Sequence, residues 1–146
     1  MSFVLRKGPC VTEKMYCGTS SALTAGAIAV FDVSTGAAVS PIIDATASLL
    51  AENVAGVVMN TPAATDYYAD VILLTPSQVW EYDCTSNTST AMLGKVNDLT
   101  DSTTVANSTT ISTANTGFVR NIGIVGASTD KKMLGLILGA QDAVAN

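Results

Sequence analysis

Hydrophobic and polar residues alternate over much of the chain, in short runs separated by turn-forming residues. The last third shows the pattern best, because residues 117–138 read as two β-strands joined by a polar turn at 126–131. Side chains two apart on a strand point the same way, so Phe118, Ile122 and Ile124 are expected to share one face of the first strand. The same spacing predicts a shared face on the second strand, formed by Leu134, Leu136 and Leu138.

Earlier parts of the chain carry the same signature. Further strands are predicted at residues 22–33, 37–43, 57–60, 71–74, 78–84 and 91–99. In the strand at 78–84, Trp80, Tyr82 and Cys84 fall on one face, which is expected to anchor the core. Gly94 would mark a bulge or a close backbone approach. Residues 101–116 are rich in Thr, Ser and Asn and fit either a long loop or two exposed strands.

One stretch has a helical pattern, and it predicts a short helix near residues 45–54. Asp44 could cap its start and Gly56 could end it. Leu49, Leu50 and Val54 would form its apolar stripe. The alternative interpretation is a loop that enters a strand at Val54.

Short strands with turn signals about every 8 to 12 residues are typical of a sandwich or barrel. We therefore predict a mainly β fold, a small single-domain β-barrel or sandwich at residues 21–139. Residues 1–20, broken by Gly8-Pro9, are predicted to form an extended N-terminal arm that lies on a neighbouring molecule. An edge strand with a frayed end is the alternative. Residues 140–146 are expected to be a loose C-terminal tail.

The composition is low in charge and favours contact with other proteins. Charged residues make up 13% of the chain, against about 25% in ordinary soluble domains. A weakly charged surface rich in Thr and Ser suits β-structure and protein contact. The net charge of −5 removes the usual electrostatic drive for binding nucleic acid or an anionic membrane surface. Neither is predicted as a partner.

The chain shows no pattern for export or membrane insertion. Arg6 and Lys7 interrupt the short apolar start where a signal peptide would continue. Residues 15–31 are broken by Gly, Ser and Thr and fall short of the roughly 20 apolar residues that a spanning helix needs. We expect a protein made in the cytoplasm that stays soluble.

No catalytic, cofactor or metal site is predicted. The chain has no histidine, which removes the usual general base and excludes Ser-His-Asp and Cys-His sites within it. Gly94-Lys95 does not make a phosphate-binding loop, because residue 89 is Ser and residue 96 is Val. Three pairs of closely spaced acidic residues are expected to lie at solvated strand ends rather than to form a site. The pairs are Asp66/Asp70, Glu81/Asp83 and Asp98/Asp101. We expect a protein that is not an enzyme.

The three cysteines, Cys10, Cys17 and Cys84, have no C-x-x-C spacing. In a reducing compartment they are expected to be free thiols packed as small hydrophobic residues. A Cys10–Cys17 disulfide is the alternative.

Several segments together resemble the small capsid decoration, or cement, proteins of tailed bacteriophages. The resemblance lies in Val-Trp-Glu-Tyr-Asp at 79–83, Leu-Gly-Lys-Val at 93–96, and the closing hairpin at 118–125 and 130–137. Residues 26–36 and 55–58 fit the first half of the pattern. The resemblance covers residues 20–138 and is one of strands and turns rather than of a fixed motif.

The resemblance implies a structural virion protein, made in the host cytoplasm, that binds the outside of an icosahedral head. Its partner would be the major capsid protein, whose subunit junctions it would reinforce as a homo-oligomer, a dimer or trimer. The contact residues expected in the arm are Phe3, Val4, Leu5 and Arg6. If the arm docks on a neighbour, deleting residues 1–15 should weaken capsid binding and leave the fold intact.

Two other functions remain open from the sequence. The chain could be a β-domain associated with a phage tail or fibre, which would form a ring or trimer without binding heads. It could also be a small-ligand or carbohydrate-binding β-domain that uses Trp80, Tyr67 and Tyr68.

Overall fold

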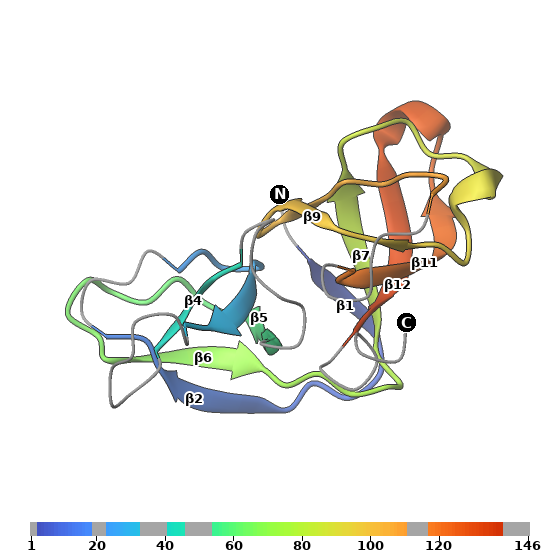
Figure 1. Cartoon of the computed structure of the whole chain (residues 1–146). Helices are drawn as coiled ribbons and strands as arrows, with labels where there is room; N and C mark the ends of the chain where they lie inside the picture. Colours follow the sequence, from blue (N-terminus) through green and yellow to red (C-terminus); the bar gives the residue numbers. More distant parts are fainter. Residues whose placement is uncertain (1–2, 19–22, 33–40, 46–53, 111–116, 139–146) are drawn as a thin grey trace.

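The computed structural model describes residues 3–18, 23–32, 41–45, 54–110 and 117–138. These residues form one small, mainly β domain with two sheets (Figure 1). Sheet A consists of β1 (Val4–Lys7), β7 (Val79–Cys84), β8 (Val96–Asn97), β9 (Leu99–Asp101), β10 (Thr104–Val105), β11 (Val119–Val125) and β12 (Lys132–Ile137). Sheet B consists of β2 (Thr12–Tyr16), β3 (Ile28–Phe31), β4 (Ile42–Asp44), β5 (Val54–Val58) and β6 (Tyr68–Ile72). The predicted mainly β, single-domain fold is confirmed.

Sheet A curves into a nearly closed, barrel-like sheet around β7. Its strand order is β8-β11-β12-β7-β10-β9, and β1 also pairs with β7. β1 is antiparallel to the first half of β7, with Leu5 opposite Trp80. β10 runs parallel to the second half, with Val105 opposite Cys84. Because the strands of sheet B lie between β1 and β7 in the sequence, the chain leaves sheet A after β1 and returns to it at β7.

Sheet B has the order β2-β6-β5-β3-β4, with β2 and β4 at its edges. Its interior strand β3 is buried on both faces: Ile28 and Val30 belong to one apolar cluster and Ala29 to another. This explains the continuous apolar run of this strand, since strands covered on both sides do not alternate. The strand predicted at 22–33 is present but shorter.

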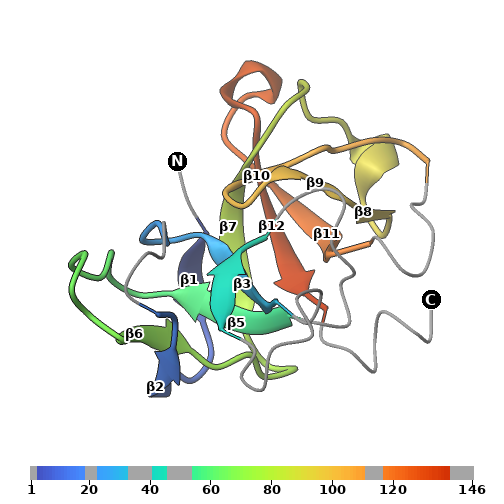
Figure 2. The same ribbon diagram turned by 60° about the vertical axis from the view of Figure 1, so that its left-hand side comes forward.

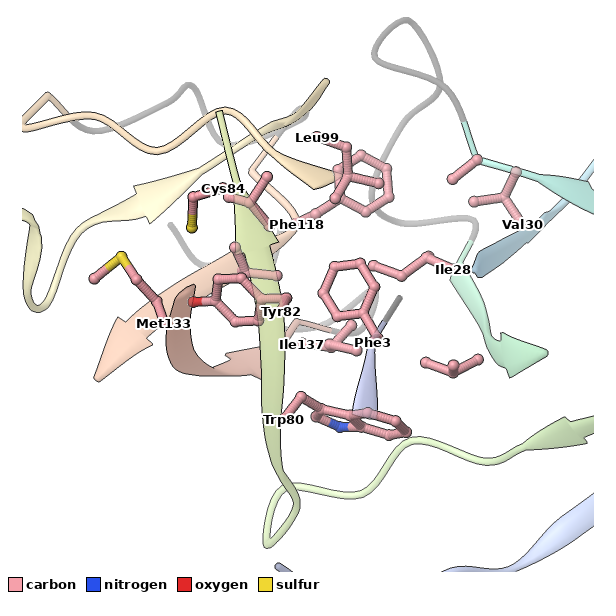
Figure 3. Close-up of a cluster of buried hydrophobic side chains, with 14 of the residues drawn as sticks. Phe3, Ile28, Val30, Trp80, Tyr82, Cys84, Leu99, Phe118, Met133 and Ile137 are labelled. Atoms are coloured by element: carbon pink, nitrogen blue, oxygen red, sulfur yellow. The ribbon is translucent and has the colours of Figure 1, made fainter. Parts of the chain in front are cut away.

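The main core lies between the two sheets. In the view of Figure 2, β3 and β5 of sheet B overlie β7 of sheet A. Figure 3 shows the core side chains, including Trp80, Tyr82 and Cys84 from β7 together with Ile28 and Val30 from β3. The three β7 residues are at most 5% exposed, so the predicted anchoring face is confirmed.

A second, smaller cluster covers the other face of sheet B. It is formed by Cys17, Leu23, Ala29, Ile42, Val58, Ala69 and Val71. All three cysteines are free thiols. Cys17 and Cys84 are packed as small hydrophobic residues, as predicted, whereas Cys10 is exposed.

The closing hairpin is present, as predicted, but the burial of its faces differs from the prediction. β11 and β12 pair in antiparallel fashion, and the 3-10 turn η3 (Ser128–Asp130) connects them. On β12, Met133 and Ile137 are buried while Leu134 and Leu136 are only half-buried. Leu138, which follows the strand, is buried. Leu134 and Leu136 share one face of the strand, as predicted, but that face is the less buried one, and Leu138 lies beyond the strand.

Close packing against β7 decides which face of β12 turns inward. Gly135 lies opposite Trp80 in the pairing with β7. A Cβ at residue 135 would collide with the hydroxyl of Tyr82 and lie 2.6 Å from the carbonyl oxygen of Arg120. Only glycine fits this inward position, and strand alternation places Met133 and Ile137 on the same inward face. On β11 the register shifts between Asn121 and Gly123, and Ile122 is exposed rather than in the core.

The predictions for residues 45–54, 91–99 and 101–116 differ from the structure or lie partly outside the described residues. Residues 46–53, with most of the predicted helix, lie outside the described residues, and Asp44 ends strand β4 directly before them. Gly56 lies inside strand β5, which begins at Val54, so it does not end a helix. The continuous strand predicted at 91–99 is wrong, because the chain forms the 3-10 turn η2 (Thr90–Met92) and then the short strands β8 and β9. Gly94 turns the chain with φ 79°. Within 101–116, residues 104–105 form the short strand β10, and residues 111–116 lie outside the described residues.

The N-terminal segment belongs to the fold over residues 3–18 and is not an extended arm. β1 pairs with β7, and β2 pairs with β6 along the edge of sheet B. Phe3 is 3% exposed and its ring centroid lies 5.4 Å from that of Tyr82. A large aromatic ring in this space fills the junction between the sheets. The alternative interpretation, an edge strand, describes β2. The tail at 140–146 lies outside the described residues.

Gln78 ties together the two connections between the sheets. It is 2% exposed. Its side-chain amide donates hydrogen bonds to the carbonyl oxygens of Pro9 and Leu73, both at 2.8 Å. Its side-chain oxygen accepts one from the Thr75 amide, also at 2.8 Å. Since Pro9 follows β1 and Leu73 follows β6, one buried side chain holds both crossovers in place.

Candidate binding surfaces

The described residues hold no group of three or more Cys, Asp and Glu side chains that could bind a metal ion. Several of the predicted rim carboxylates are instead ion-paired across strands. The pairs are Arg6 with Glu81 at 2.8 Å, Lys14 with Asp70 at 3.0 Å, and Lys132 with Asp83 at 2.8 Å. The hydrogen bond to Asp83 raises the pKa of Lys132, so this pair stays charged. Each pair joins neighbouring strands, which gives these carboxylates a structural role.

The buried titratable groups of β7 stay neutral near neutral pH. Burial raises the pKa of the Cys84 thiol to about 12. Burial also raises the pKa of Tyr82 well above its ordinary value. A thiol needs to ionise to act as a nucleophile, so Cys84 is a core residue rather than a reactive one.

The polar side chains inside sheet A form a closed hydrogen-bond network. The hydroxyl of Tyr82 donates to the side-chain oxygen of Asn121 at 2.7 Å. The Asn121 side-chain amide donates to Asn97 at 2.7 Å and to the carbonyl oxygen of Met92 at 3.2 Å. Each of these polar atoms therefore has a hydrogen-bond partner, as buried polar groups in a structural core require. Sequence reasoning missed both asparagines, although asparagine inside an apolar strand is an unusual choice.

One open cleft lies on sheet B, and we call it the tyrosine cleft. It has a volume of about 380 Å³. It is formed by residues of β2, β6 and the loop before β6, which are Lys14, Asn60, Thr61, Pro62, Asp66, Tyr67, Tyr68, Ala69 and Asp70. The pairing of β2 with β6 brings Lys14 opposite Asp70 and Tyr16 opposite Tyr68.

The aromatic rings of this cleft are exposed. Tyr67 and Tyr68 are 57% and 56% exposed. The Tyr16 ring meets that of Tyr68 edge to face, with centroids 6.0 Å apart. Trp80, in contrast, is 1% exposed. Of the three aromatic residues considered from the sequence for ligand stacking, Trp80 is therefore a core residue, and the two tyrosines lie at the surface.

Backbone contacts hold the tyrosine cleft in shape. The carbonyl oxygen of Tyr67 accepts hydrogen bonds from the amides of Cys17 and Gly18, at 2.8 and 3.3 Å. The Asp66 carboxylate accepts one from the Ala63 amide at 2.9 Å, which closes the loop before β6. Cys17 lies next to this loop, and burial, followed by the negative charge of Asp66, raises the pKa of its thiol.

A second hollow, the apolar groove, lies where β1 meets β5. It has a volume of about 320 Å³ and contains no charged side chain. Its lining is Phe3, Val4, Leu5, Ala25, Gly26, Val57, Val58, Met59 and Ile72. Val4 and Met59 are 41% and 46% exposed, so apolar side chains remain accessible here.

The structure separates the four predicted contact residues into two groups. Phe3, Val4 and Leu5 come together along the apolar groove. Phe3 does so as a buried core residue, so it is not the free contact that was predicted. Arg6 is exposed, does not line the groove, and pairs with Glu81. Val4 and Leu5 remain the candidates for contact with a partner.

No known family model matches the chain, and neither a curated protein nor a solved structure is significantly similar to it. No helix within the described ranges is long and apolar enough to cross a membrane. The function therefore rests on the two surfaces.

Proposed function

We propose that this chain is a structural virion protein that binds the outer surface of a phage capsid and stabilises contacts between major capsid subunits. The observation that supports it best is the apolar groove, where Val4 and Leu5 lie beside the exposed side chain of Met59. An uncharged hollow of this kind suits an inserted apolar side chain of a partner protein.

The physical requirement for a cement protein is many modest contacts shared by neighbouring subunits. A molecule that binds the assembled shell but not its separated subunits stabilises the shell by mass action. Contacts repeated through a homo-oligomer, a dimer or trimer, multiply this effect through avidity. The low charge of the chain fits contacts of this type, because interface centres are poor in charged residues.

The test is decoration of empty capsids. The purified chain is added to undecorated, expanded phage heads built from the major capsid protein, and occupancy is measured by electron microscopy. We expect Val4→Asp and Met59→Asp to reduce occupancy at least about tenfold, since each buries a charge on docking. Ile122→Asp is the matched control, because Ile122 is equally exposed but lies on β11, away from the groove.

Two results would contradict the proposal. One is that the unaltered chain does not bind the heads at all. The other is binding to tails or fibres instead, which would assign the chain to the other structural class. Occupancy that is unchanged in both groove variants would place the capsid contact elsewhere on the molecule.

A further inference from the structure

We propose that the tyrosine cleft is a binding site for a neutral saccharide, a pyranose ring of a glycan. This site is separate from the apolar groove, because the two hollows share no lining residue. It does not rest on the proposed capsid function.

The first argument is that the two most exposed aromatic side chains of the described residues lie here, since Phe31 on β3 is 38% exposed and Tyr16, beside Tyr68, is 37% exposed. The other large aromatic residues of the core, Trp80, Tyr82 and Phe118, are at most 1% exposed. Tyr67 and Tyr68 are adjacent in sequence, and each keeps more than half of its surface in water. Grouped exposed aromatic surface on a small domain is typical of a binding site. Tyrosine supplies such surface at little cost in conformational entropy.

The second argument is the mixture of polar groups around the rings. A sugar hydroxyl both donates and accepts a hydrogen bond. Lys14 supplies donors, Asp66 and Asp70 supply acceptors, and Asn60 supplies both. Apolar ring faces surrounded by a few such groups suit the C–H face and the hydroxyl edge of a pyranose.

The third argument concerns charge. One lysine and two aspartates give the lining a net charge of only −1. The ammonium of Lys14 already lies 3.0 Å from the Asp70 carboxylate. An anion such as a phosphate would face an acidic lining, and a cation would compete with Lys14 for Asp70. A neutral ligand meets neither obstacle.

The fourth argument is size and rigidity. A volume of about 380 Å³ lies within the range of small-ligand sites, about 300 to 1,000 Å³. The amide contacts to the carbonyl oxygen of Tyr67 and to the carboxylate of Asp66 fix the loop before a ligand arrives. A site held in place in this way loses little entropy on binding.

The experiment is a titration of the isotopically labelled full chain, followed through its backbone amide signals. The probes are methyl β-glucoside, methyl β-galactoside, N-acetylglucosamine, cellobiose and lactose, with the acyclic sorbitol as a negative control. We expect at least one cyclic sugar, and not sorbitol, to shift the amide signals of residues 14 and 66–70. Tighter binding of a disaccharide would identify a glycan chain as the source, and equal binding a free sugar.

The variants test whether the rings carry the binding. We expect Tyr67→Ala and Tyr68→Ala each to weaken binding about tenfold, and Tyr67→Phe to retain it, because the ring face remains. Ile122→Ala, an exposed apolar residue on the other sheet, should change nothing. Amide spectra of each variant show directly whether it is folded.

The proposal is overturned if no cyclic sugar shifts the cleft signals, or if the alanine variants bind as the unaltered chain does. It is also overturned if the alanine variants reduce capsid occupancy and no sugar binds, since the cleft would then be a protein contact. Failure of the chain to decorate capsids has no bearing on sugar binding, so the two proposals fail separately.

Discussion

At the scale of single residues, Gly8 lies where the backbone of the first crossover passes close to that of the second. A Cβ here would lie 2.7 Å from the Ser77 carbonyl oxygen and 2.9 Å from the Cα of Gln78. Its φ of +99° is also one that side chains rarely adopt. Gly94 has a similar φ of +79° but nothing within 4 Å of the added Cβ. Substitution of Gly94 would therefore cause backbone strain alone, whereas substitution of Gly8 would cause both strain and steric collision.

We predict that Gly8→Ala lowers the free energy of unfolding by about 3 kcal/mol, from strain plus collision with backbone atoms. Gly94→Ala should lower it by about 1 kcal/mol, from strain alone. Urea denaturation of both variants measures the difference. Equal losses would mean that the crossovers move apart at little cost.

Cys84 gives the molecule a pH dependence in the alkaline range. Burial raises its pKa from 9.0 to about 12 in the folded state. The unfolded thiol ionises near pH 9 while the folded one stays protonated, so its contribution is fully present below pH 9 and is lost as the pH rises towards 12. We predict a decrease in unfolding free energy over this window, measured by denaturation at fixed pH values. Cys84→Ala should show a shallower decrease, and an identical slope would contradict this assignment.

At the scale of elements, Gln78 couples the two sheets through their connections. We predict that Gln78→Met, which keeps the length of the side chain, lowers the unfolding free energy by about 3 kcal/mol. The reason is that the Thr75 amide and the carbonyl oxygens of Pro9 and Leu73 lose their hydrogen-bond partner. Ser77→Ala, at an exposed neighbouring hydroxyl, should change the unfolding free energy by less than about 0.5 kcal/mol. Thermal or urea unfolding distinguishes the two, and equal stabilities would show that the crossovers hold without Gln78.

At the scale of the whole molecule, the N-terminal strands complete both sheets. We predict that deleting residues 1–15 abolishes cooperative unfolding, because it removes Phe3 and β1 from the core junction and most of β2 from sheet B. This replaces the expectation from sequence that the fold would survive the deletion. Circular dichroism and thermal melting provide the measurement, with Val4→Asp as a variant that should still fold, since Val4 is exposed. A cooperative transition in the deleted chain would show that the N-terminal segment is an addition to the fold.

The sequence by itself determined the features that depend on local pattern. Alternation in the strand at 78–84 correctly predicted that Trp80, Tyr82 and Cys84 share the buried face. Turn-forming residues correctly placed the closing hairpin, and the irregular cysteine spacing correctly predicted free thiols. These succeed because period and turn chemistry act over a few neighbouring residues.

Only the tertiary structure decided features that depend on distant partners. The inward face of β12 consists of Met133, Gly135 and Ile137 rather than of its leucines, and Gly135 fits there against Tyr82. The tyrosine cleft exists because β2 pairs with β6, far along the chain, and so brings Lys14 to Asp70. Phe3 is in the core because β1 pairs with β7. The pairing of strands that are far apart in the sequence cannot be recognised from a few neighbouring residues. Local patterns could therefore place these residues on strands but could not identify their partner strands.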